Sequence, residues 1–391
     1  MNQVYADFLQ LIKSAIQNIP IPSADLSNFE AWVNIAQKHR VATLFYYGVI
    51  NSGLFSPEDP KLKPLFHAAC NDLIIHERQI HELNRITAAF DANAIDYMVV
   101  KGPNLKAIYP KPEMRPMSDI DILIRTEQYE TIKPVMTDLG FWEKLESNHE
   151  FVWQNAKCHI ELHKFLIPSY NPDYFSYYGN GWRLAKKTEG TRHVLSDEDA
   201  FIYLFTHFAK HYRDSGIGLR HAVDLWVCRC HNPKLNESYI RDELKKLQLD
   251  TFYVNIMDML KAWFDDAPAT LVTEFITEFI FSNGLYGTRQ SQILSSALRE
   301  KKRSGSGKGL RAKRIWKIVF LPFNALCERY PVLERLPILL PFVWFWHLLR
   351  RLFAVKKMKR YGKEMALITE KNVSAYEDAL HYVGLDFNFE E

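Results

Sequence analysis

Apolar residues recur at helical spacing over the first 90 residues and again from about residue 193. Phe8, Leu9, Ile12 and Ile16 show this spacing near the N-terminus. The second stretch begins at Ser196, whose hydroxyl and following acidic residues are typical of a helix N-terminus. We therefore expect helices over residues 1–90 and 193–298. At 391 residues, the chain is long enough for two or three domains.

Residues 91–192 contain short apolar runs that are typical of β-strands. The run Ile95–Lys101 is closed by Gly102 and Pro103, as expected of a buried strand and its exit turn. A brief helix is predicted at 105–108, a strand begins after residue 118, and a helix is predicted near 127–138. A strand after Gly140 and two runs around a turn at 155–157 complete the region.

Two carboxylates, Asp119 and Asp121, stand at the start of the apolar run Ile120–Ile124. In a strand, side chains at i and i+2 point the same way, about 6.6 Å apart. Neighbouring carboxylates need a cation, and oxygen-rich sites suit Mg²⁺. The pair therefore favours a metal site of a phosphate-handling enzyme. By itself, the pattern equally fits a Ser-Asp turn that only begins a strand.

Two further groups of polar residues have a spacing that suits a site. His159, Glu161 and His163 alternate with apolar residues, so they share one strand face, which is either solvent-exposed or turned toward the same metal. His207 and His211 are four residues apart and share one side of a helix. Without an adjacent Glu, that pair favours packing or hydrogen bonding over a zinc site.

Composition excludes several classes of protein. Lys and Arg number 49 against 46 Asp and Glu, so no strong field draws the chain to nucleic acid. The five cysteines are odd in number and scattered, which suits a reducing compartment. No signal peptide is recognisable, and the longest apolar candidate, residues 336–349, is shorter than the roughly 20 residues of a membrane span. A cytoplasmic protein is expected.

The C-terminal part is basic, glycine-containing and then rich in proline and aromatic residues. Residues 299–314 lack the strand and spacing of a phosphate-binding loop, so we interpret them as a flexible linker. A basic amphipathic helix within 346–365 is compatible with peripheral contact to anionic lipid. Packing of its apolar face on its own domain is the favoured interpretation.

Taken in order, these motifs resemble the nucleotidyltransferase superfamily. The similarity is greatest to a bacterial family of uncharacterised nucleotidyltransferases and covers about residues 28–230. It is carried by Val100-Lys101-Gly102, residues 115–124, Ile160–His163, Leu204–His207 and Lys210-His211. The resemblance implies an α+β fold, with a mixed β-sheet flanked by helices and mostly helical N-terminal and C-terminal regions. The implied division is an N-terminal helical region (1–90), a catalytic domain (91–192), a helical domain (193–298), the linker (299–314) and a helical C-terminal region (315–391).

The resemblance also implies an activity and a set of site residues. The reaction would be Mg²⁺-dependent transfer of a nucleoside monophosphate from an NTP to a hydroxyl of a small molecule or protein, with two ions and Mn²⁺ as an alternative. The resemblance implies metal binding and catalysis by Asp119, Asp121 and Glu161. It implies nucleotide binding by Lys101, Gly102, Asn104, Arg115 and Ser118. His163, His207 and His211 would contact the metal-binding residues and orient them without binding the metal.

The sequence departs from the wider superfamily at two positions. Pro103 follows Gly102 where many relatives have Ser, and proline has no N–H to offer a phosphate. Glu161 stands where Asp is common, which places its carboxylate one methylene further out.

Other functions remain open from the residues. A phosphatase of the haloacid dehalogenase type is disfavoured, since its Asp-x-Asp follows a strand and here the strand follows the pair. A metal-dependent glycosyltransferase would not explain Lys101-Gly102 or Glu161. A catalytically weak nucleotide-binding or antitoxin-like partner module is the main alternative.

Overall fold

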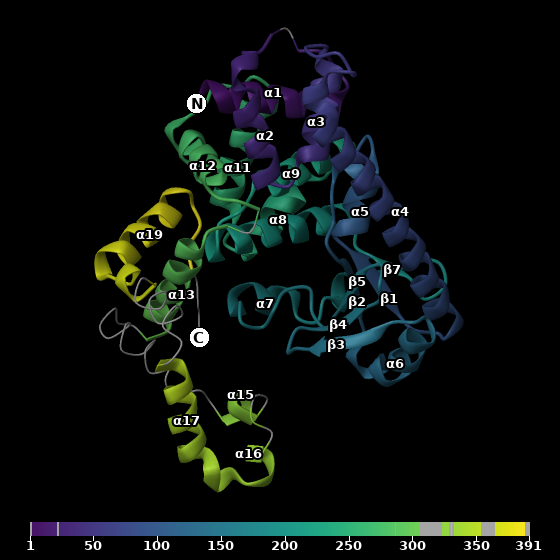
Figure 1. The fold of residues 1–391 in the computed structure, drawn as a ribbon, viewed down its shortest axis with the longest axis vertical. Coiled ribbons are helices and arrows are strands. Elements are labelled where there is room, and N and C mark those ends of the chain that lie inside the picture. The colour runs from purple at the N-terminus through teal and green to yellow at the C-terminus, as the bar shows by residue number, and fades with distance from the viewer. Residues whose placement is uncertain are drawn as a thin grey trace. The chain divides into compact units, whose positions relative to one another are not determined.

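The computed structural model describes residues 2–21, 23–285, 287–304, 323–327, 330, 332–352 and 364–387. The chain forms two compact units. The first comprises residues 1–212, 216–287 and 383–390, and the second comprises residues 213–215, 288–382 and 391 (Figure 1). Short 3₁₀ helices occur at Leu26–Asn28, Pro60–Leu62, Pro112–Met114, Thr126–Gln128, Trp182–Leu184 and Pro337–Leu339.

The first unit begins with four α-helices, as the helical spacing predicts. They are α1 (Gln3–Gln17), α2 (Phe29–Lys38), α3 (Ala42–Ser52) and α4 (Lys63–Ala92). The Asn2 side chain accepts a hydrogen bond from the Val4 N–H and caps α1, which ends at Asn18 in a left-handed conformation. The apolar residues of α1 form one buried face, so packing stabilises this helix.

A five-stranded mixed sheet follows. Its strands are β1 (Tyr97–Val100), β2 (Ile120–Ile124), β3 (Trp142–Glu146), β4 (Glu150–Gln154) and β5 (His159–His163). They are arranged in the order β1-β2-β5-β4-β3. The pair β2–β5 is parallel and the other three pairs are antiparallel. The helix α5 (Gly102–Ala107) joins β1 to the loop before β2, and it starts three residues earlier than the sequence predicts.

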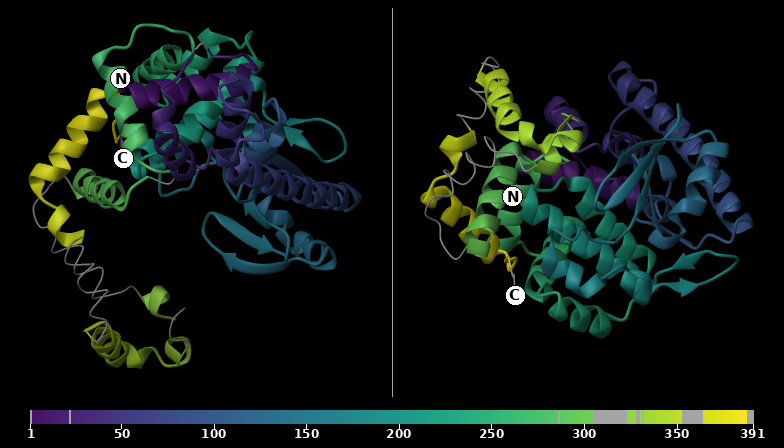
Figure 2. Two further views of the ribbon diagram at one scale, coloured as in Figure 1. Left: turned by 45° about the horizontal axis from the view of Figure 1, so that its top comes forward. Right: turned by 90° about the horizontal axis from the view of Figure 1, so that it is seen from below.

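One face of the sheet is the apolar core. Ile120, Ile122 and Ile124 of β2 are fully buried there, together with residues of α4 and α6 (Tyr129–Asp138). The long helix α4 runs along this side of the sheet (Figure 2). Because side chains alternate along a strand, the intervening Asp121 is turned to the opposite face. The predicted α+β class, a mixed sheet flanked by helices, is confirmed.

The remainder of the first unit is mainly helical. Its elements are α7 (Pro172–Tyr178), the two-stranded pair β6 (Lys186–Lys187) and β7 (His193–Val194), α8 (Asp197–Asp214), α9 (Leu219–His231), α10 (Glu237–Lys246), α11 (Asp250–Phe264) and α12 (Leu271–Ser282). On α8, Phe201, Phe205 and Phe208 are buried, in agreement with the predicted apolar face.

The second unit contains α13 (Arg289–Ser304), α15 (Phe323–Cys327), α16 (Val332–Arg335), α17 (Leu340–Leu352) and α19 (Glu370–Tyr382). Lys301 and Lys302 of α13 form ion pairs with Glu377 of α19. The predicted linker begins at residue 299, whereas α13 continues to Ser304, and residues 305–314 lie outside the described residues.

The basic helix predicted within 346–365 is covered only in part. Residues 346–352 belong to α17, and residues 353–363 lie outside the described part of the chain. Among the described residues, no helix is both long enough and apolar enough to cross a bilayer.

Candidate active site

The polar face of the sheet brings acidic groups from two neighbouring strands together. Asp121 of β2 is in register with Glu161 of β5, because these strands are parallel and adjacent. The side chain of His163, two residues further along β5, reaches the same place. Ligand atoms of Asp121, Glu161 and His163 all lie within 4.8 Å of one another.

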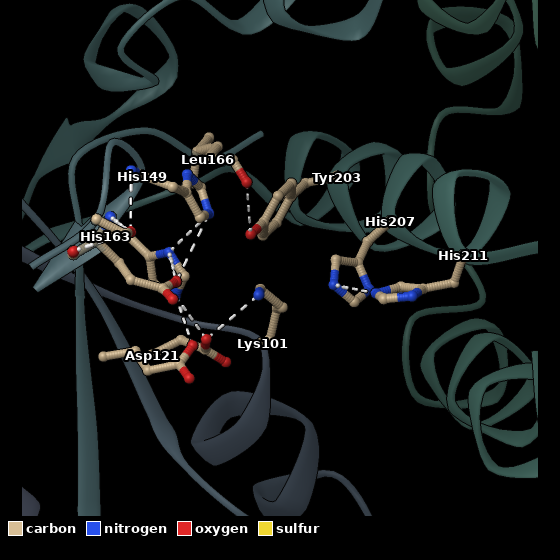
Figure 3. A network of polar contacts seen from close by, with 11 residues as sticks. Lys101, Asp121, His149, His163, Leu166, Tyr203, His207 and His211 are labelled. Atoms are coloured by element: carbon tan, nitrogen blue, oxygen red, sulfur yellow. Dashed lines mark hydrogen bonds and ion pairs between the residues drawn. The ribbon is translucent and has the colours of Figure 1, made fainter. Parts of the chain in front are cut away.

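His163 makes polar contacts with both ring nitrogens (Figure 3). Its Nε2 lies 2.7 Å from Asp121 Oδ1 and 3.5 Å from Glu161 Oε2. Its Nδ1 lies 3.1 Å from His149 Nε2. The buried imidazole therefore connects the carboxylates on one side with His149 on the other.

Lys101 reaches Asp121 from the end of β1. Its Nζ donates a hydrogen bond to Asp121 Oδ1 at 3.3 Å. Lys101 is the N-cap of α5, and its backbone has φ 50° and ψ −103°, a conformation that residues other than glycine rarely adopt. Such strain costs on the order of 1–3 kcal/mol and is maintained by the surrounding structure. In Figure 3, the Lys101 ammonium lies between Asp121 and the α8 residues Tyr203 and His207.

The carboxylates have different pKa values because their neighbours differ. Burial and the nearby charges of Asp119, Asp121 and Glu150 raise the pKa of Glu161 to about 8. Burial and the Asp121 charge also raise the pKa of Asp119. Burial acts in the same direction on Asp121, but Lys101 and His163 outweigh it and hold the pKa of Asp121 below its usual range. The protein thus stabilises the charged form of Asp121 and disfavours the charged forms of Asp119 and Glu161.

These groups line one cavity of about 330 Å³. Asp119 is outside the set of three converging ligand atoms but lines the same cavity. The residues predicted from sequence that line it are Lys101, Gly102, Arg115, Ser118, Asp119, Asp121, Glu161, His163, His207 and His211.

Asn104 lies elsewhere. It lines a neighbouring cavity, and its side-chain amide donates to the Val99 carbonyl oxygen at 2.9 Å. Because α5 starts at Gly102, Asn104 has a helical position, and its side chain bonds to β1.

Arg115 lines the cavity, but its guanidinium is bonded to the protein. Its Nε and Nη2 donate to the two carboxylate oxygens of Asp224 at 2.7 and 2.9 Å. The hydroxyl of Tyr109 donates to the same carboxylate at 2.8 Å. Since Asp224 is fully buried on α9, this pair fastens the loop before β2 to the helical region.

Gly102 packs against the Met117 side chain of that loop. A Cβ atom at this position would stand 2.2 Å from Met117 Sδ. A side chain at position 102 would therefore have to displace the Met117 side chain.

His207 and His211 face each other from consecutive turns of α8, with Nε2 atoms 3.1 Å apart. Burial is the main cause that holds both pKa values well below the usual range, and neighbouring cations add to it. These histidines are therefore neutral at physiological pH and contribute polar atoms, not charge, to the cavity.

The cavity is also lined by residues that the sequence analysis did not propose as site candidates, among them His149, Glu150, Lys210, Arg220 and His221. A signal existed for Lys210, which follows His207 by three residues and so shares its side of the helix. Glu150 is in register with His163 across the β4–β5 pair, a relation that becomes visible only when these strands are paired.

The mixed sheet flanked by helices matches the fold that the resemblance to nucleotidyltransferases implies. A family model described as uncharacterised nucleotidyltransferase matches residues 25–265, which is more than half of the chain. The chain belongs to this nucleotidyltransferase family.

The chain was also compared with solved structures and with curated proteins. A solution structure of the antibiotic-resistance factor ANT(2'')-Ia is similar over 46% of this chain and 95% of that one, with 15% identity and a TM-score of 0.32. At these values the similarity supports no further conclusion. No similar sequence was found among curated proteins.

Proposed function

We propose that the protein transfers a nucleoside monophosphate from an NTP to an acceptor hydroxyl on a small molecule or protein. The observation that carries the proposal is the joint position of Asp119, Asp121 and Glu161 in one cavity with Lys101. The family membership supports nucleotidyl transfer as the class of reaction.

The carboxylates fit a hard divalent cation. All three offer oxygen ligands, the type that Mg²⁺ prefers, and Mn²⁺ is an alternative. Burial and neighbouring carboxylates raise the pKa values of Asp119 and Glu161, so the charged forms of these groups are disfavoured until a cation binds. We propose that Asp119, Asp121 and Glu161 hold Mg²⁺, two ions in the full complex. Bound there, the metal would supply Lewis-acid stabilisation of charge on the transferred phosphoryl group.

The other cavity residues have roles that follow from their charge and position. Lys101, and Lys210 and Arg220 on the helical side, make the cavity favourable for a triphosphate and for the pyrophosphate that leaves. Glu161, beside the two aspartates, would accept the proton of the attacking hydroxyl in its ionised form. His163 keeps Asp121 oriented through the 2.7 Å contact.

Arg115 and Ser118 were predicted to bind the nucleotide. We propose a positioning role for Arg115, because its pair with Asp224 fixes the loop that carries Ser118 and Asp119. Gly102 permits that loop to approach α5 closely.

The test is nucleotide consumption by the purified chain with each labelled NTP, Mg²⁺ and a panel of hydroxyl compounds, followed by mass spectrometry of the products. Asp119→Asn should lower turnover by at least about 100-fold, since the lost metal interaction contributes several kcal/mol. Its thermal stability without metal should hold or rise, because burial and Asp121 already disfavour the charged form of Asp119. Asp138→Asn, at an exposed position of α6, is the matched control and should leave turnover unchanged.

A large loss of metal-free stability in Asp119→Asn would instead assign this carboxylate a structural role. NTP binding by the wild-type chain without product, for every nucleotide and acceptor tried, would favour a nucleotide-binding or antitoxin-like partner module.

A further inference from the structure

We propose that His149, Glu150 and His163 form a second metal site, specific for a borderline transition metal of the Zn²⁺ class. The three side chains meet on the side of His163 that faces away from Asp121. Their ligand atoms are two imidazole nitrogens and one carboxylate oxygen. This mixed donor set suits Zn²⁺, whereas Mg²⁺ prefers oxygen alone.

The distances between these atoms match a tetrahedral site. His163 Nδ1 lies 3.1 Å from His149 Nε2 and 3.6 Å from Glu150 Oε2, and the last two atoms are 3.9 Å apart. With metal–ligand bonds of about 2.0–2.1 Å, tetrahedral ligand atoms stand about 3.3–3.4 Å from one another. A metal ion therefore requires shifts of only about half an ångström.

The sheet holds the three residues in this arrangement before any metal binds. Glu150 and His163 are directly opposed in the antiparallel β4–β5 pair. His149 is fixed at the start of β4, where its carbonyl accepts from the Lys164 N–H at 2.8 Å and its own N–H donates to Ser147 Oγ. The site therefore loses little side-chain and backbone freedom on binding, which favours affinity.

Access and a fourth ligand are provided by the cavity. His149, Glu150 and His163 all line it, with side chains 18%, 22% and 5% exposed. Three protein ligands beside an open cavity leave one position for water or a substrate oxygen, as in zinc sites that are not purely structural.

His163 also links the new site to the carboxylates. With a metal on Nδ1, the Nε2 nitrogen carries the hydrogen and donates it to Asp121 Oδ1, 2.7 Å away. A carboxylate behind a metal-bound histidine is a common arrangement that fixes the ring and strengthens the ligand. Occupancy should therefore influence the orientation of Asp121. This last step rests on the proposed function, whereas metal binding itself does not.

The His207–His211 pair is a second group of imidazole nitrogens in the same cavity. Its nitrogens are also 3.1 Å apart, but within the described part of the chain no third metal-ligand atom completes a cluster with them. Two ligands bind a metal ion more weakly than three held by a sheet, so the pair is the natural control.

The experiment is equilibrium binding of Zn²⁺ and Co²⁺ to the chelator-treated, full-length chain. Zn²⁺ is measured by competition with a chromophoric chelator, and Co²⁺ by the visible absorption of its tetrahedral complex. We expect one ion per chain, with retention in millimolar Mg²⁺. His149→Ala should weaken binding by at least about 100-fold, since even the loss of a supporting contact behind a ligand costs 10–100-fold. Glu150→Gln, which preserves side-chain shape, should also remove the tetrahedral spectrum.

Three variants serve as controls. His159→Ala removes an exposed histidine of the same strand, and His207→Ala removes the competing pair, so both should keep the wild-type affinity. Asp119→Asn should keep the Co²⁺ spectrum while it loses nucleotide turnover, which separates this site from the proposed Mg²⁺ site. Circular dichroism confirms that each variant is folded.

Absence of a tetrahedral Co²⁺ spectrum in the wild-type chain would overturn the proposal. Undiminished binding in folded Glu150→Gln, or loss of binding in His207→Ala, would overturn it as well.

Discussion

Arg115→Met separates a structural role for this arginine from nucleotide binding. Arg115 and Asp224 form a two-pronged pair with distances of 2.7 and 2.9 Å, and their side chains are 7% and 0% exposed. Removal of the guanidinium leaves the Asp224 carboxylate buried, with a hydrogen bond from the Tyr109 hydroxyl but without its charged partner Arg115. Breaking a buried pair in this way typically costs about 3–5 kcal/mol, so we expect a loss of that size in the free energy of unfolding.

A second substitution tests the cause of the loss. Arg115→Met/Asp224→Asn removes the buried negative charge and retains an oxygen that accepts the Tyr109 hydrogen bond. The double variant should therefore recover much of the stability that Arg115→Met loses. The assay is denaturant unfolding of wild type, both single variants and the double variant, which together give the coupling energy.

An exposed pair of the same geometry is the control. Arg241 bonds Asp250 at 2.8 and 2.9 Å, but their side chains are 44% and 22% exposed. Water compensates for a lost partner there, so Arg241→Met should be much milder. If Arg115→Met kept wild-type stability and raised the KM for NTP, the guanidinium would act on the nucleotide and the structural reasoning would be refuted.

Two further predictions concern the turn after β1 and a buried histidine. Gly102→Ala should destabilise the fold by about 1–3 kcal/mol through overpacking against Met117, and Met117→Ala should rescue it in denaturant titrations. Gly284→Ala, whose new Cβ would stand 3.5 Å from the nearest atom, should have little effect, and equal effects at the two glycines would contradict the argument. Burial, with a contribution from a neighbouring lysine, lowers the pKa of His39 from 6.5 to about 4. Its neutral Nδ1 accepts a hydrogen bond from the Leu219 N–H at 3.1 Å. The stabilisation by neutral His39 is therefore complete above pH 6.5, and about 3 kcal/mol of it is lost as the pH falls to 4. His39→Asn keeps an acceptor but does not titrate, so the stability difference between wild type and variant should change by that amount between pH 7 and 4, and a constant difference would show that His39 does not titrate as described.

Local patterns were sufficient for the sheet and its acidic face. The alternation of Ile120, Asp121 and Ile122 separates core from cavity because the strand period of two is a local property. The helical spacing near the N-terminus was equally reliable, since one face of α1 is buried.

Long-range pairing was the information that the sequence lacked. Arg115 forms an ion pair with Asp224 on α9, and no local spacing relates two residues so far apart in the chain. His149 joins His163 only through the β4–β5 register. Asn104 lines a neighbouring cavity and not that of the carboxylates, a position that depends on where α5 begins.

The Lys101–Asp121 contact has a consequence for how this protein matures. Many metalloproteins cannot fold until their ion arrives, because the ligands repel one another in its absence. Here an ammonium from the neighbouring strand end already serves as the counter-ion of Asp121, the most buried of the three site carboxylates. We therefore expect the sheet that carries Asp121 to fold before any divalent ion binds.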